Sequence, residues 1–154
     1  MRGLFFAHLL ALLFLSPLFA AEPVSTSFLG NTAIGGKDAV SYHSTEVKKS
    51  HAVRDGDKRY EVQYLGAKWH FASKESADKF AANPAAYAPT YNGHCANALS
   101  EGEGLVKTDG EVWEFFGDKL YLFYAEKGRQ RWVKGDWQHY RSQADAAWLL
   151  ELKK

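Results

Sequence analysis

Residues 59–82 decide the fold of this chain, and they read RYEVQYLGAKWHFASKESADKFAA. Apolar and polar residues alternate on both sides of Gly66, a pattern typical of two antiparallel strands joined by a tight turn. Ser73 is a preferred helix N-cap, and apolar residues recur after it at helical spacing. The stretch therefore predicts a β-hairpin over 59–71 followed by a helix over 74–82.

The same two patterns recur toward the C-terminus. Alternating apolar residues over 112–124, with a Gly-Asp pair in the middle, predict a second hairpin. Apolar residues spaced by three and four over 137–150 predict an amphipathic helix whose apolar face returns to the core. Between the first helix and the second hairpin, Asn92 is expected to cap a further helix that runs to about Leu99.

Turn-forming glycines organise the N-terminal part of the sequence. The pair at 35–36 predicts a turn before a short strand within 33–43, and the Asp-Gly pair at 55–56 predicts a hairpin turn. The order of strands, helices, strands and a last helix indicates an α+β fold. We expect one small domain over 34–150, with antiparallel β-hairpins packed against about three helices.

An export signal is expected before this domain. Residues 1–21 begin with the positive Arg2, continue with an apolar run over 4–19 and end in small residues, as signal peptides do. The run is short for a membrane span. We therefore expect a soluble periplasmic or secreted protein, with no transmembrane segment after cleavage. The Pro-, Ser-, Thr- and Gly-containing segment 22–33 is expected to be a tether.

The charge balance argues against two classes of partner. Removing Arg2 with the leader leaves 18 of the 19 basic residues against 18 acidic ones. A neutral chain has no basic surface for nucleic acid and no polybasic patch for anionic lipid. No spacing typical of a serine triad, a paired-carboxylate site or a phosphate loop is present. The sequence therefore leaves open whether the protein is an enzyme.

The single cysteine, Cys95, is the most informative functional residue. Thiols in exported proteins normally pair, and Cys95 has no partner within the chain. With Asn92 as the N-cap, Cys95 is the third residue of its helix, where N–H groups and the helix dipole favour the thiolate. A thiolate attacks peroxides and disulfides, and it binds soft metals. The alternative is that Cys95 is a small buried apolar residue.

Six blocks of the sequence occur in a characteristic order. They are Gly36–Tyr42 (GKDAVSY), Tyr64–Ser73 (YLGAKWHFAS), Phe80–Pro89 (FAANPAAYAP), Tyr91–Ala96 (YNGHCA), Gly117–Leu122 (GDKLYL) and Ala144–Trp148 (ADAAW). In this order the blocks resemble the YHS-domain proteins, and the later ones resemble a long, exported branch of that family. Some members of this branch carry selenocysteine, which implies thiol or selenol chemistry at Cys95 if the selenocysteine falls at this position.

The resemblance also implies metal handling. Short YHS modules occur beside copper-transporting ATPases, and their cysteines are the presumed metal ligands, so copper is the implied cofactor. In this chain the corresponding positions carry no cysteine: Ser41, Ala72 and Ser76. To hold Cu(I) at low coordination number, Cys95 needs one or two imidazoles as further ligands, and the candidates are His94, His70 and His43.

These observations leave three functions open. The first is an exported YHS-domain protein that binds or handles copper through Cys95. The second is a thiol-based redox protein or sensor, in which Cys95 is oxidised to the sulfenate and resolved by an external thiol. The third is a non-catalytic interaction module of the cell envelope. A metal site requires a histidine within ligand reach of the sulfur. A redox site requires an exposed sulfur in a cleft with basic or N–H neighbours and no converging ligands, and an inert thiol is sealed among apolar side chains.

Overall fold

The structure of the protein, a computed structural model, describes residues 22–154, and the leader predicted over 1–21 lies outside the described residues. No helix in the described part is long and apolar enough to cross a membrane. The elements, in chain order, are η1 (Ile34–Gly36), η2 (Ser41–His43), α1 (Thr45–Ser50), β1 (Asp57–Tyr64), β2 (Ala67–Phe71), α2 (Lys74–Ala82), α3 (Pro84–Tyr87), η3 (Thr90–Gly93), α4 (Ala96–Ser100), β3 (Val112–Phe116), β4 (Lys119–Phe123), α5 (Glu126–Lys134) and α6 (Trp137–Glu151).

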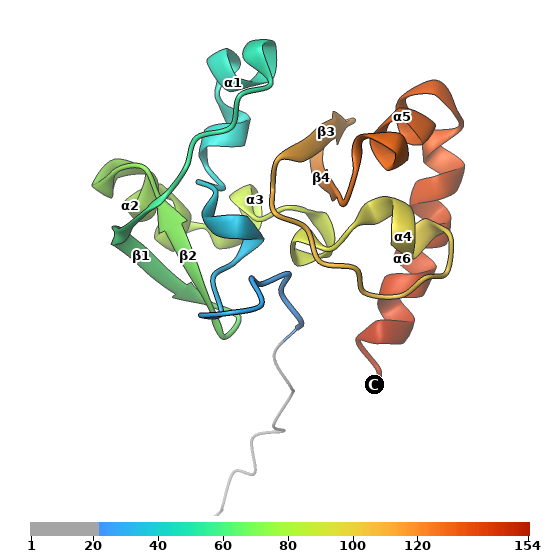
Figure 1. Ribbon diagram of the computed structural model, residues 1–154, viewed down its shortest axis with the longest axis horizontal. Helices are drawn as coiled ribbons and strands as arrows, with labels where there is room; N and C mark the ends of the chain where they lie inside the picture. Colours follow the sequence, from blue (N-terminus) through green and yellow to red (C-terminus); the bar gives the residue numbers. More distant parts are fainter. Residues whose placement is uncertain (1–21) are drawn as a thin grey trace, which may run out of the picture.

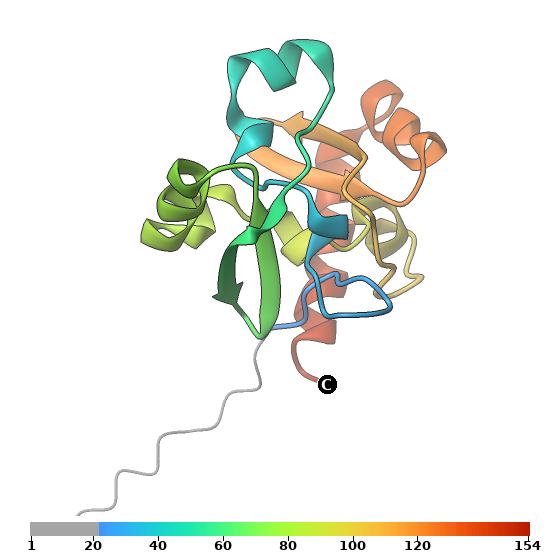
Figure 2. The same ribbon diagram turned by 60° about the vertical axis from the view of Figure 1, so that its left-hand side comes forward.

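The elements form two lobes (Figure 1). The hairpin β1–β2 and helix α2 lie in the first lobe, and α4, α5 and α6 lie in the second (Figures 1 and 2). β1 pairs antiparallel with β2, and β3 pairs antiparallel with β4, which confirms both predicted hairpins. Helices α2 and α6 also lie where the sequence predicts them. The α+β fold is therefore confirmed.

The hairpin β3–β4 lies between the lobes and contributes to the core of both. Trp113 and Leu122 pack into the apolar cluster of the first lobe. Tyr121 and Phe123 pack into the apolar cluster of the second lobe. Successive side chains of a strand point to opposite faces, so one hairpin fills two cores and joins them.

The segment 33–43 does not form the short strand that the sequence predicts. It forms the two 3₁₀ turns η1 and η2 instead. The carboxylate of Asp38 accepts hydrogen bonds from the N–H groups of Val40 and Ser41, at 2.9 and 3.2 Å. These bonds stabilise a turn instead of an extended strand. The same carboxylate accepts a third N–H, from Ala72 at 3.0 Å, which attaches this segment to the end of β2.

The predicted hairpin turn at 55–56 is also wrong. Asp55 forms an isolated bridge with Lys37, and the Lys37 ammonium lies 2.6 Å from the Asp55 carboxylate. The first strand of the hairpin, β1, begins only after this contact. A long-range pairing therefore replaces the local turn that the Asp-Gly pair favours.

The segment 22–33, predicted to be a tether, packs against the domain. Ser25 is fully buried, and its N–H donates to the carbonyl of Asn92 at 3.0 Å. Its own carbonyl accepts the N–H of Ile34 at 2.8 Å. These contacts place the segment beside η3, the turn that precedes Cys95.

The helix that carries Cys95 begins later than predicted. Asn92 has a left-handed φ of 49°, and its side-chain amide donates to the carbonyl of Pro23 rather than capping a helix. The first helical residue is Ala96, and Cys95 itself is the N-cap. The predicted helix is therefore short, and the thiol lies at its beginning rather than within its first turn.

Candidate functional site

Cys95 lies at the junction of η3 and α4, and its side chain is almost fully buried. Its sulfur accepts two backbone hydrogen bonds, from Ala98 N–H at 3.5 Å in α4 and from Tyr124 N–H at 3.2 Å after β4. The N–H of Cys95 donates to the carbonyl of Val106 at 2.8 Å. N–H groups directed at a sulfur stabilise a thiolate more than a thiol.

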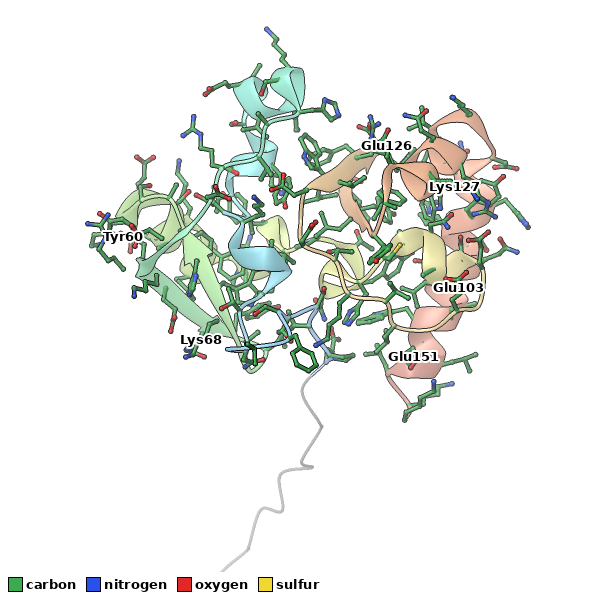
Figure 3. The ribbon with its side chains drawn as sticks, in the orientation of Figure 1. Tyr60, Lys68, Glu103, Glu126, Lys127 and Glu151 are labelled. Carbon is green, nitrogen blue, oxygen red and sulfur yellow. The ribbon has the colours of Figure 1, made fainter. Side chains whose placement is uncertain are left out.

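The sulfur forms part of the wall of a pocket of about 420 Å³. Basic Lys127 and Arg131, from α5, line it together with the acidic Glu101 and Glu103, which follow α4. Glu103 and Lys127 both lie on the second lobe (Figure 3). The other lining residues are Asn97, Ala98, Val106, Tyr124, Ala125 and Gly128. Cys95 is 4% exposed and belongs to the buried apolar cluster of the second lobe, so its sulfur is not the exposed sulfur expected of a redox site. Charged groups and N–H groups lie on the side of the thiol that faces the pocket.

Arg131 is held in a fixed position at this pocket. Its Nη1 donates to Asn97 Oδ1 at 2.9 Å and to Ser100 Oγ at 3.0 Å. Its guanidinium lies 3.7 Å from the centroid of the Tyr140 ring in α6. The close approach of α5 to α4 requires Gly128, because a Cβ there would lie 3.0 Å from the Asn97 Cβ. The basic side of the pocket is therefore set by the packing of three helices.

His94, the histidine nearest to Cys95 in sequence, is directed elsewhere. Its Nδ1 lies 3.0 Å from the carbonyl of Tyr91, and its ring lies beside Trp148, with 6.0 Å between centroids. Burial lowers the pKa of His94, so the ring is neutral at pH 7. It does not line the pocket that contains the sulfur.

His70 lies in the other lobe from the thiol. It is on β2, where its Nε2 is 3.1 Å from the carboxylate of Glu61 on β1. Among residues 22–154, no group of three His, Cys, Asp or Glu side chains is arranged to hold a metal ion. The predicted ligands Cys95, His94 and His70 are therefore not brought together, and this donor set does not fit the implied Cu(I) site.

The positions at which the resemblance implies cysteines do lie together, in the first lobe. Ser41, Ala72 and Ser76 line a single pocket of about 260 Å³. Arg54 and Lys79 also line this pocket. Hydroxyl groups and cations are poor ligands for soft metal ions. The pocket is therefore present, but its side chains do not fit copper.

The comparison with protein families concerns this first lobe. Residues 48–91 match the YHS domain. The chain contains a YHS domain. No curated protein and no solved structure matches the chain. The YHS domain ends within η3, so Cys95 lies beyond its matched residues.

The residues around Cys95 that the sequence analysis does not find lie outside the YHS domain as well. Tyr124 supplies an N–H after β4. Lys127 and Arg131 come from α5, a helix that the sequence pattern does not predict. Within α5, Trp132 alone is buried. The one large aromatic residue in this charged stretch, Trp132, was the available sequence signal for the helix. A single apolar residue does not show a helical period.

Proposed function

We propose that this YHS-domain protein is a thiol-based redox protein, in which Cys95 forms a mixed disulfide with an external partner. The observation that carries the proposal is the position of the sulfur. It accepts N–H groups from Ala98 and Tyr124 at the wall of a pocket that also holds Lys127 and Arg131. The thiolate is the reactive form of cysteine, and these groups lie where it would form.

The reaction requires few protein groups. The Cys95 thiolate attacks one sulfur of an external disulfide, so that a bond from Cys95 to that sulfur forms while the external S–S bond breaks. The departing thiolate then takes a proton from the solvent. Arg131 and Lys127 stabilise the negative charge on the departing sulfur. The sequence contains one cysteine, so a second external thiol must release Cys95.

A peroxide leads to the same mixed disulfide by another route. The thiolate attacks one peroxide oxygen, which gives the sulfenic acid and an alkoxide or hydroxide that takes up a proton. An external thiol then attacks the sulfur of the sulfenic acid, and water leaves as the disulfide forms. Both routes require access to the pocket and no residue beyond those that line it.

Copper handling remains a prediction of the YHS resemblance. Cys95 is the one soft donor among the residues that line its pocket, and none of the predicted histidines is among them. A single thiolate gives Cu(I) one protein ligand, whereas low-coordinate copper sites use two or three. We therefore favour redox chemistry, and a Cu(I) titration separates the two functions.

The test compares the mature protein with its Cys95→Ser variant. After incubation with oxidised glutathione, intact-mass measurement should show one glutathione adduct on the native protein and none on the variant. Arg131→Gln should slow the reaction about tenfold while the protein stays folded. Reaction that occurs only after unfolding in urea would show that the thiol is inert. Tight Cu(I) binding that requires Cys95 would favour metal handling instead.

A further inference from the structure

A second surface adjoins the Cys95 pocket. It is a shallow pocket of about 330 Å³, to which Phe28, Lys107 and Tyr124 contribute. Phe28 is 96% exposed and Tyr124 is 70% exposed, and adjoining exposed aromatic side chains form an apolar patch of the kind that marks interaction sites. Tyr124 lines both pockets, so the apolar surface continues directly into the site of the thiol.

The turn that carries Phe28 is fixed rather than loose. The N–H of Ser27 donates to the carbonyl of Thr32 at 2.8 Å, and the hydroxyl of Ser27 donates to the carbonyl of Leu29 at 2.7 Å. Leu29 is exposed beside Phe28. The turn therefore presents two adjacent apolar side chains to the solvent from a defined position.

An extended segment runs between the two pockets. Over 104–110 the residues are alternately less and more exposed, with exposed Leu105 and Lys107 on either side of Val106. This period of two is that of a strand. The backbone of Val106 bonds to Cys95, and Thr108 N–H donates to the hydroxyl of Ser25 at 2.9 Å. One edge of the segment is thus paired with the protein.

The other edge of the segment has no partner. The backbone N–H and carbonyl groups of Leu105 and Lys107 form no hydrogen bond with any residue from 22 to 154. In an extended chain these groups point away from the edge that is already paired. An exposed strand edge is a template for another extended chain, whose main-chain groups satisfy the free donors and acceptors.

We propose that Phe28, Tyr124 and the free edge of Leu105 and Lys107 bind an extended segment of a partner polypeptide. Free main-chain donors and acceptors favour a peptide over a lipid surface, which cannot pair with them, and Glu103 beside the edge opposes anionic lipid. The role of Cys95 rests on the proposed function: the bound segment carries the cysteine or disulfide that reacts with it. The substrate is then a protein rather than a small thiol.

The chemistry of that step is thiol–disulfide exchange at the bound segment. The Cys95 thiolate attacks one sulfur of the partner's disulfide, a bond between the two chains forms, and the partner's S–S bond breaks. The released thiolate of the partner is protonated by solvent. Pairing along the edge positions the reacting sulfur, which raises the rate without any further catalytic group.

The binding test uses full mature protein with Cys95→Ser, so that it does not depend on thiol chemistry. The probe is a fluorescein-labelled nine-residue peptide of alternating Val and Thr with a central Ser, and its control is the same peptide with alternate backbone nitrogens methylated. Fluorescence anisotropy should show micromolar binding of the first peptide and at least tenfold weaker binding of the second. Phe28→Ser should weaken binding about tenfold, and because Phe28 is 96% exposed the variant should fold normally.

Three other outcomes overturn the proposal. Equal affinity for the two peptides would show that main-chain pairing is not used. An unchanged affinity in Phe28→Ser would exclude this surface. Concentration-dependent dimers that Phe28→Ser abolishes would show that a second copy of the chain occupies the edge. If peptide binding holds while Cys95 forms no adduct with oxidised glutathione, the surface stands and the redox function fails.

Discussion

The two lobes have similar cores and different surfaces. Each is built around a fully buried tryptophan, Trp69 in the first and Trp132 in the second, surrounded by other aromatic rings. The first lobe carries the YHS domain, and its pocket contains serine and alanine at the positions where the resemblance implies metal ligands. The second lobe carries Cys95 at the border between its apolar cluster and a pocket lined by charged residues. The family match therefore describes one lobe, and the candidate chemistry belongs to the other.

This separation changes how the family match can be used. Metal handling, which the resemblance implies, would be expected in the lobe that matches, but no thiol or imidazole is among the residues that line the pocket there. The thiol site is built from η3, α4, β4 and α5, all of which lie at or beyond the end of the match. Function is therefore better argued from the geometry of the second lobe than from the name of the domain.

The largest expected loss of stability comes from removing a buried tryptophan, and this experiment also tests whether the two lobes unfold as one unit. Trp69→Ala and Trp132→Ala each remove a fully buried ring, and each should lower the free energy of unfolding by about 3–5 kcal/mol. Because the hairpin β3–β4 belongs to both cores, each variant should show a single urea transition. Circular dichroism and tryptophan fluorescence should follow the same curve.

Val133→Ala is the matched control for these variants. Val133 is half-exposed and adjoins Trp132 in sequence, so its truncation should change the stability by less than about 0.5 kcal/mol. Two separate urea transitions in Trp132→Ala, with the first lobe still folded, would show that the lobes are independent.

A somewhat smaller loss of stability is expected when Asp38 is replaced, and the hydrogen bonds of its carboxylate lie in the first lobe alone. Its buried carboxylate accepts three backbone N–H groups, and Asp38→Ala leaves all of them without an acceptor. We expect a loss of about 3 kcal/mol, measured by thermal or urea unfolding. Asp38→Asn keeps one acceptor oxygen and should lose less. Equal losses in the two variants would show that the hydrogen bonds are not the cause.

The fold could be predicted where its pattern is local. Both hairpins and the helices α2 and α6 follow from alternation, helical spacing and the N-cap Ser73, and all four are present. The errors arise where a distant residue decides the local conformation. Lys37 pairs with Asp55 in place of the predicted turn, and Asp38 binds the N–H group of Ala72, directly after β2, in place of the predicted strand. Such contacts cannot be read from a short window of sequence.

The site could be predicted only in part. The importance of Cys95 follows from its being the one cysteine of the sequence, and the sulfur does lie at the start of a helix. Its surroundings could not be foreseen, because Tyr124 and Arg131 reach it through β4 and α5. The direction of the His94 side chain could not be foreseen either, because the left-handed turn before it determines that direction. Sequence thus identifies the candidate atom but not its neighbours.

The smallest expected effect is a change in how stability depends on pH, and it is compared for one histidine in each lobe. Burial lowers the pKa of His43 in the first lobe and of His94 in the second. In the unfolded chain both should titrate near pH 6.5. Below that pH the unfolded state therefore binds more protons than the folded state, so stability is complete above about pH 6.5 and falls as the pH falls toward the lowered values.

The comparison is made with one variant in each lobe. His94→Gln keeps a donor for the carbonyl of Tyr91, and His43→Leu removes a ring nitrogen, Nε2, that is buried without a partner among the described residues. Urea unfolding at pH 5 and pH 7 should show a smaller loss of stability on acidification in each variant than in the parent, and a smaller loss still in the double variant. Additive effects are expected, because the two rings lie in separate lobes and share no contact. A loss of stability in the double variant as large as in the parent would show that other groups cause the acid sensitivity.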